Sequence, residues 1–114
     1  MSDSTEDFYC EQVLSGLTPV AKVFESERVL AYHHTRPFWP VHIVVIPKIH
    51  VSSLLTIADD GLLLELLAAA KTVAAQVVAD TGAARVLTNL GRYQDSKHLH
   101  FHVISGEQLR PDES

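Results

Sequence analysis

Residues 98–104 read His98-Leu99-His100-Phe101-His102-Val103-Ile104, and this stretch decides what fold the chain can adopt. Histidines alternate here with apolar residues, and a period of two is typical of a β-strand that buries one face. A strand would place the three histidines on one face, about 6.5–7 Å apart at a rise of ~3.3 Å per residue. Imidazoles at that spacing can surround a small anion, or two of them can share a metal. A merely solvated face would be expected to carry Thr, Lys or Glu, so we interpret the histidines as a functional site.

A second informative stretch lies upstream and reads Pro40-Val41-His42-Ile43-Val44-Val45-Ile46-Pro47-Lys48-Ile49-His50. Its nearly continuous run of β-branched residues predicts a buried central strand, which Pro47 should end. The two prolines at 37 and 40 predict a constrained loop just before this strand.

The other patterns complete an α+β outline. The segment Asp7–Ser15 predicts a short helix, and Ala21–Glu25 with Arg28–His33 predicts a β-hairpin. The Leu, Ala and Val residues of Asp60–Ala79 predict a long helix, capped by Ser52 or Asp59/Asp60 and ended by Thr81-Gly82. Because this helix is apolar on all sides, we expect it to be largely buried against the sheet or at a subunit contact. Arg85–Asn89 predicts a short strand, and the order of elements predicts a mainly antiparallel sheet.

The two quoted stretches together resemble the histidine triad family. That family carries His-apolar-His-apolar-His followed by two apolar residues, and, upstream, Pro-x-His, three apolar residues, Ile-Pro-Lys-x-His. The resemblance covers about residues 7–106, which we take as one domain, with residues 1–6 and 107–114 as loosely ordered termini. It implies a five-stranded, mainly antiparallel sheet with two helices, and a homodimer.

The resemblance also implies an activity. Family members hydrolyse or transfer nucleoside monophosphates that are substituted at the α-phosphate, such as phosphoramidates and adenylates, through a nucleotidyl-histidine intermediate. His100 matches the nucleophile, His98 and His102 would orient it and hold oxygens, and His42 matches a fourth active-site histidine. The alternatives are a dinucleoside polyphosphate hydrolase and a nucleotide-binding module without significant turnover.

The resemblance assigns a purine nucleotide to a further group of residues. Asn89, Gln94 and Asp95 would lie on the phosphate side, and His34 at the ribose. The base would be lined by Tyr32, Phe8 and Tyr9. Two positions depart from the family pattern, because His34 stands where an acidic residue is expected and Asp95 where a hydroxyl is expected. A carboxylate beside a phosphate is repulsive unless it is protonated or turned away.

Composition limits the remaining options. The chain has 114 residues and a net charge of −5, so a general affinity for nucleic acid is not expected. No basic leader is visible, no apolar run reaches the ~18 residues of a membrane span, and we expect a cytoplasmic protein without a membrane partner. With a single cysteine, Cys10, no disulfide can form within the chain. No cofactor is required; zinc held by Asp7, Cys10, His50 and His98 is the alternative that the resemblance leaves open.

Overall fold

The computed structural model describes residues 13–14, 16 and 19–109. Its five strands form one antiparallel sheet in the order β1-β2-β3-β5-β4. The strands are β1 (Lys22–Glu25), β2 (Val29–His33), β3 (Val41–Pro47), β4 (Arg85–Leu87) and β5 (Phe101–Ser105). The predicted fold class and the five-stranded sheet are confirmed. The first of the two expected helices, at 7–15, falls almost wholly outside the described residues.

The strand β3 occupies the middle of the sheet, as its β-branched sequence predicts. It pairs with β2 on one side and with β5 on the other. Its residues from 42 to 47 are all buried, because both faces of a central strand are covered. The two strands predicted on either side of residues 25–27 form the expected hairpin of β1 and β2.

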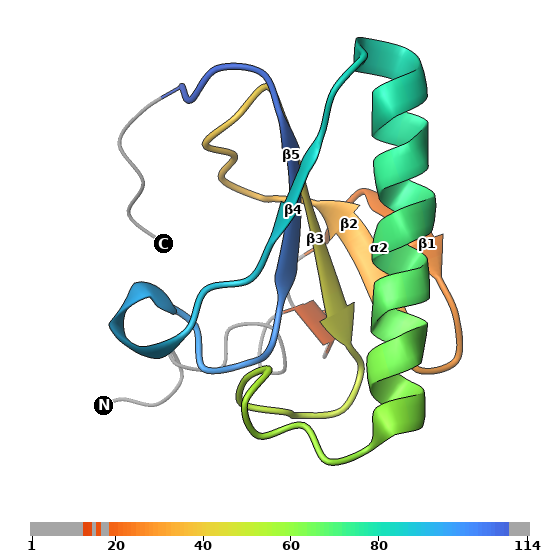
Figure 1. Cartoon of the computed structure of the whole chain (residues 1–114), viewed down its shortest axis with the longest axis vertical. Helices are drawn as coiled ribbons and strands as arrows, with labels where there is room; N and C mark the ends of the chain where they lie inside the picture. Colours follow the sequence, from red (N-terminus) through yellow and green to blue (C-terminus); the bar gives the residue numbers. More distant parts are fainter. Residues whose placement is uncertain (1–12, 15, 17–18, 110–114) are drawn as a thin grey trace.

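The helix α2 (Asp60–Thr81) covers one face of the sheet (Figure 1). Asp59 is its N-cap and accepts a hydrogen bond from Leu62 N at 3.0 Å, while Gly82 ends it in the left-handed conformation. The prediction of a largely buried helix holds for one side: its buried residues are Leu62, Leu66, Ala69, Ala70, Val73 and Val77.

The opposite side of α2 is exposed, including the apolar residues Leu64, Leu67 and Val78. By its length and composition alone, α2 is long and apolar enough to cross a membrane. This finding differs from the expectation that the sequence contains no such stretch. The core helix of a soluble protein passes the same test, and the inner side of α2 packs on Val29, Ile43 and Val103 of the sheet.

The other face of the sheet carries two irregular segments, residues 34–40 and 88–100 (Figure 1). A second, smaller apolar cluster of Val13, Leu30, Tyr32, Val44 and Ile46 also lies on this face. The segment 88–100 contains the short 3-10 helix η2 (Gly91–Tyr93). Because side chains alternate along a strand, His42 of β3 and His102 of β5 point to this face, away from α2.

The strand predicted at 98–104 begins later than expected. Only Phe101–Ser105 is strand, and His98 and His100 precede it in irregular backbone. The ladder with β3 ends at the Val45–Phe101 pair, and β4 reaches no further than His102, so residues 98–100 lack strand neighbours on either side. The strand β4 is also shorter than the predicted Arg85–Asn89, because its pairing with β5 ends at Leu87.

Candidate active site

Four histidine rings lie next to one another on the helix-free face of the sheet. The ring centroids of His34 and His42 are 4.3 Å apart, those of His42 and His102 are 5.0 Å apart, and those of His102 and His100 are 4.8 Å apart. His42, His100 and His102 are each at most 3% exposed. The structure therefore brings together the predicted nucleophile, the third triad histidine, the upstream histidine and His34.

Sheet register explains why His42 meets His102, although 60 residues separate them. His42 pairs with Ile104, and Val44 pairs with His102, so the two histidines are diagonal neighbours on one face of adjacent strands. Diagonal neighbours in an antiparallel pair lie within reach of aromatic rings. The Nε2 atom of His42 lies 2.9 Å from Nδ1 of His102.

The direction of that hydrogen bond follows from the loop before β3. The backbone N–H of Phe38 donates to Nδ1 of His42 at 3.0 Å, and a backbone N–H can only donate. The proton of the neutral His42 ring is therefore on Nε2 and is donated to Nδ1 of His102. The neutral His102 ring must then carry its own proton on Nε2.

Nε2 of His102 is a buried polar atom without a hydrogen-bond partner in the described structure. Burial, and then the neighbouring His100 and His42, lower the pKa of His102 to about 2, so the ring is neutral at neutral pH. A buried N–H donor without an acceptor is costly, and such atoms in a native fold call for a functional explanation. The atom is placed to donate to an oxygen of a bound anion.

His100 presents the complementary chemistry. Its Nδ1 lies 2.8 Å from the carbonyl oxygen of His98, which can only accept, so Nδ1 carries the proton and Nε2 has the lone pair. Burial lowers the pKa of this ring, which favours its neutral form. A neutral imidazole held in one tautomer by a carbonyl is a suitable nucleophile.

The side chain of His98 contacts Pro47 and His50 and is not one of the four clustered rings. It is fully buried, and its Nε2 lies 2.9 Å from the carbonyl oxygen of Pro47 at the end of β3. The contact of His98 with His100 runs through the backbone carbonyl of His98. Its ring packs edge-on against His50, with centroids 5.4 Å apart.

The residues predicted to bind the nucleotide differ in their burial and in their contacts. Gln94 is buried, and its amide nitrogen donates to the carbonyls of Ser52 and Ser96 at 2.7 and 2.8 Å, so it ties two loops together. Asn89 is half-buried, and Asp95 is exposed and raises the pKa of His100 against the effect of burial. Tyr32 is 1% exposed within the smaller apolar cluster. Phe8 and Tyr9 lie outside the described residues.

His34 differs from the acceptor expected at a ribose. Its Nδ1 accepts a hydrogen bond from the backbone N–H of Arg36 at 2.9 Å, so the neutral ring carries its proton on Nε2. His33 and His34 are neighbours in the sequence. The structure separates them, because His33 points to the face that α2 covers.

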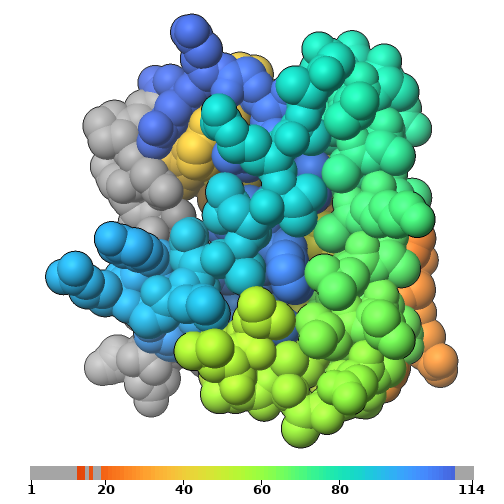
Figure 2. Space-filling model, viewed as in Figure 1, coloured from red at the N-terminus to blue at the C-terminus, as the bar shows by residue number. Residues whose placement is uncertain are grey.

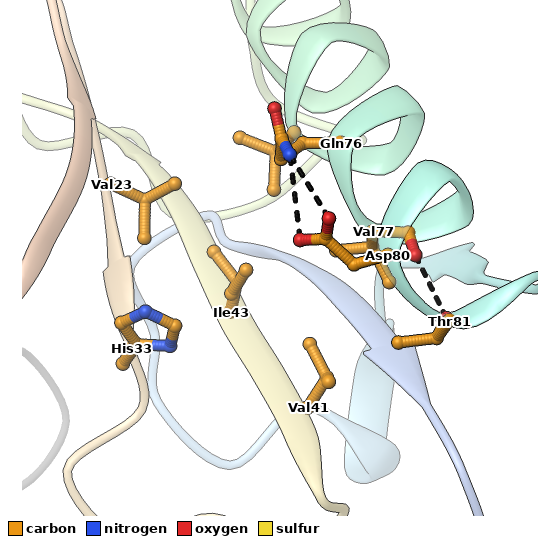
Figure 3. A pocket seen from close by; sticks show the side chains of 9 residues that line it. Val23, His33, Val41, Ile43, Gln76, Val77, Asp80 and Thr81 are labelled. Atoms are coloured by element: carbon orange, nitrogen blue, oxygen red, sulfur yellow. Dashed lines mark hydrogen bonds between the residues drawn. The ribbon is translucent and has the colours of Figure 1, made fainter.

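His33 lines a hollow of about 200 Å³ on the α2 side of the sheet (Figure 3). Its lining combines apolar side chains, such as Val41, Ile43 and Val77, with the polar side chains of His33, Gln76 and Asp80. The sheet separates this hollow from the four-histidine cluster, which therefore remains the candidate active site.

Two of the four zinc ligands proposed from the sequence, His50 and His98, lie within the described residues. Asp7 and Cys10 lie outside them, while Nε2 of His98 is used on Pro47. Among the residues that the structure describes, no group of three or more His, Cys, Asp or Glu side chains could hold a metal. A zinc site thus stays a prediction.

Comparison with known proteins agrees with this geometry. An uncharacterized HIT-like protein of Helicobacter pylori is 33% identical over 104 residues, covering 86% of this chain and 95% of that protein. A HIT family hydrolase from Clostridium thermocellum superposes with a TM-score of 0.77 at 28% identity, covering 95% and 96% of the two chains. A hypothetical histidine triad nucleotide-binding protein from Sulfolobus tokodaii superposes with a TM-score of 0.79 at 32% identity, covering 92% and 72%.

The family model of the HIT domain matches residues 16–109, which include β1 to β5, α2 and all seven histidines. The match, the sheet and the histidine cluster agree with the resemblance first drawn from two short motifs. The chain belongs to the HIT domain family.

Proposed function

We propose that this protein is a nucleotide hydrolase that cleaves a phosphorus–nitrogen or phosphorus–oxygen bond at the α-phosphate of a substituted nucleoside monophosphate. The observation that carries the proposal is that two neighbouring rings have complementary groups: His100 has a lone pair on Nε2, and His102 has a buried N–H donor at Nε2. The hydrolase and nucleotide-binding names of the structural neighbours support the same class.

The first step is a displacement at phosphorus. The lone pair of His100 Nε2 forms a bond to phosphorus, and the bond from phosphorus to the leaving nitrogen or oxygen breaks. The leaving group departs with the bonding electrons and takes a proton from solvent. The Nδ1–H of His100 donates to the His98 carbonyl throughout, which favours the positive charge that develops on the ring. His102 Nε2–H stabilises negative charge on a phosphoryl oxygen or on the leaving atom.

The second step is hydrolysis of the nucleotidyl-histidine. Water adds to phosphorus, the bond to His100 Nε2 breaks and returns the lone pair, and the water gives up one proton. The products are a nucleoside monophosphate and the protonated leaving group. No residue needs to change its net protonation over the cycle, which suits a buried and neutral set of rings.

Local donors must attract the anionic substrate, because the net charge of the chain is −5. A purine nucleotide, with Asn89 and Asp95 near its phosphate side, remains the proposed ligand. The structure favours a loop-tethering function for Gln94 over direct phosphate contact, since both amide protons are already used.

The decisive experiment uses three substrates: adenosine phosphoramidate, an aminoacyl adenylate and diadenosine polyphosphates. Single-turnover reactions are followed by intact mass, which reports both products and a nucleotidyl adduct. We expect an adduct on His100 and fast cleavage of the first two substrates. His100→Ala should abolish hydrolysis and the adduct while AMP binding survives, because binding is shared among many contacts.

Other outcomes identify the alternatives. Preferential cleavage of the diadenosine substrates would favour a dinucleoside polyphosphate hydrolase. Tight AMP binding without an adduct or product would favour a binding module. Near wild-type turnover of His100→Ala would remove His100 from the mechanism.

We further propose that the protein is a homodimer, formed through the outer side of α2. The exposed residues Leu64, Leu67 and Val78 lie on this side, together with Ala68 and Ala75 at helical spacing. Figure 2 shows this side of the helix without any covering segment in that view. Val86 of the edge strand β4 is also exposed, and a second copy would cover such apolar surface.

A further inference from the structure

The loop that precedes β3 starts at His34, which contacts its surroundings through its backbone, its Nδ1 atom and its ring. Its backbone N–H donates to the carbonyl of His42 at 2.8 Å, and its Nδ1 accepts from Arg36 N at 2.9 Å. Its ring stacks on that of His42 at an interplanar angle of 28°. A side-chain acceptor bonded to the N–H two residues ahead closes a local turn, as Asn and Asp side chains often do.

The other end of this loop holds the donor that sets the tautomer of His42. Phe38 is 4% exposed, its N–H donates to His42 Nδ1, and its carbonyl accepts from Leu109 N at 2.7 Å. Only three residues separate His34 from Phe38, and one of them is Pro37. A change in the turn at His34 is therefore transmitted directly to the Phe38 amide.

We propose that His34 is a positioning residue, whose Nδ1 shapes the 34–38 loop so that Phe38 N–H holds His42 in the tautomer that orients His102. The path runs from Nδ1 of His34 to Arg36 N, along the loop to Phe38 N, then through the His42 ring to Nδ1 of His102. Every hydrogen bond on this path measures 2.9 or 3.0 Å. The proposal rests on the proposed function only for its kinetic consequence, since every hydrogen bond of the path joins two groups of the protein itself.

Two features of His34 could position His42, and substitution can separate them. Asn has a side-chain oxygen three bonds from Cα, as His has Nδ1, so His34→Asn keeps the acceptor and removes the ring. His34→Phe keeps an aromatic ring over His42 and removes the acceptor. His34→Ala removes both, and His33→Ala is the matched control, because His33 points into the hollow on the other face.

We expect the acceptor to decide the result. The Phe and Ala variants should lose about threefold to tenfold in kcat on the best substrate, the rate equivalent of one neutral hydrogen bond. KM should change by less than about twofold, because the relay acts on the reacting atoms and not on general binding. His33→Ala should retain wild-type kcat, and the Asn variant should lose clearly less kcat than the Phe and Ala variants.

The second readout needs no substrate. Nitrogen-15 NMR of the histidine rings reports which nitrogen carries the proton, and hydrogen exchange reports the Phe38 amide. In wild type and His34→Asn, we expect His42 protonated at Nε2 and a protected Phe38 amide. In the Phe and Ala variants, we expect mixed tautomers of His42 and faster exchange of that amide.

The combined results separate this proposal from the proposed function. An unreactive wild-type protein with the predicted NMR pattern would reject the hydrolase and leave the positioning by His34 standing. A Phe variant with an unchanged His42 tautomer, or an Asn variant that behaves like Ala, would overturn the positioning by Nδ1. Full kcat in His34→Ala would overturn it as well.

Discussion

Nε2 of His98 lies 2.9 Å from the carbonyl oxygen of Pro47, 51 residues earlier in the chain. The ring of the first triad histidine thus joins the end of β3 to the segment that enters β5. Its backbone carbonyl, in turn, holds His100. One residue therefore supports the nucleophile through its main chain and the sheet through its side chain.

Substitution of His98 should accordingly act on stability more than on chemistry. We expect His98→Ala to lower the free energy of unfolding by about 2–4 kcal/mol, because it opens a cavity and leaves a buried carbonyl without its donor. His98→Gln carries an amide that can still donate to Pro47 and should recover much of the loss. Urea unfolding measures both variants. Unchanged stability of His98→Ala would contradict this structural role.

Acidification should destabilise the fold through two of the buried histidines, His100 and His102. Burial lowers the pKa of His100, and burial with His100 and His42 lowers that of His102 to about 2, both from an ordinary value of 6.5. Below pH about 6.5 the unfolded chain binds more protons than the folded one, so stabilisation is complete above that pH and is lost as the pH falls toward the folded values.

Each such histidine contributes a slope of at most about 1.4 kcal/mol per pH unit to the stability in this window. Urea unfolding at several values between about pH 7 and pH 5 measures the slope. His102→Gln removes one of the two contributions and should make the curve less steep. A curve that is flat for the wild type would show that these rings take up protons in the folded state.

Gly106 should tolerate a side chain less well than Gly82, although both have a similar backbone. Their φ angles are +91° and +94°, but a Cβ atom on Gly106 would lie 2.8 Å from Cγ of Pro40, whereas Gly82 faces open space. Gly82→Ala should cost about 1–2 kcal/mol for the left-handed backbone alone. Gly106→Ala should cost about 1–3 kcal/mol more from overpacking.

Pro40 directly precedes β3. A side chain at Gly106 that pushes Pro40 aside should also displace the loop that holds His42, so we expect Gly106→Ala to be less active than the wild type. Thermal unfolding and turnover of the two variants provide the comparison. Equal losses of stability at both glycines would mean that Pro40 moves aside without cost.

The proposed dimer predicts a specific sensitivity on α2. Leu64 and Leu67 are 67% and 45% exposed, and a glutamate at either position would bury a charge in a dimer contact. We expect the wild type to scatter light as twice the 12.6 kDa chain, and Leu64→Glu with Leu67→Glu to scatter as one chain. Leu55→Glu is the matched control, because Leu55 is 76% exposed but lies outside α2. A wild-type monomer at micromolar concentration would refute the proposal.

Much of the fold follows from local patterns in the sequence. The β-branched run before Pro47 is the central strand, and Asp59 and Gly82 bound the long helix. These features depend on residues a few positions apart, whose backbone preferences and caps act without the rest of the chain. The start of β5 was wrong by three residues, because a strand begins only where its neighbours offer partners.

The sequence by itself determined the family, the sheet, and the residues that supply imidazole chemistry. Only the tertiary structure decided what each imidazole does: Nδ1 of His34 is used on Arg36, and the ring of His98 on Pro47. It also placed the proton of His102 on the buried Nε2, through the register that sets His42 diagonally beside it. The physical reason is that a tautomer depends on the partner of each ring nitrogen, and strand pairing and loop closure bring in those partners from distant parts of the chain.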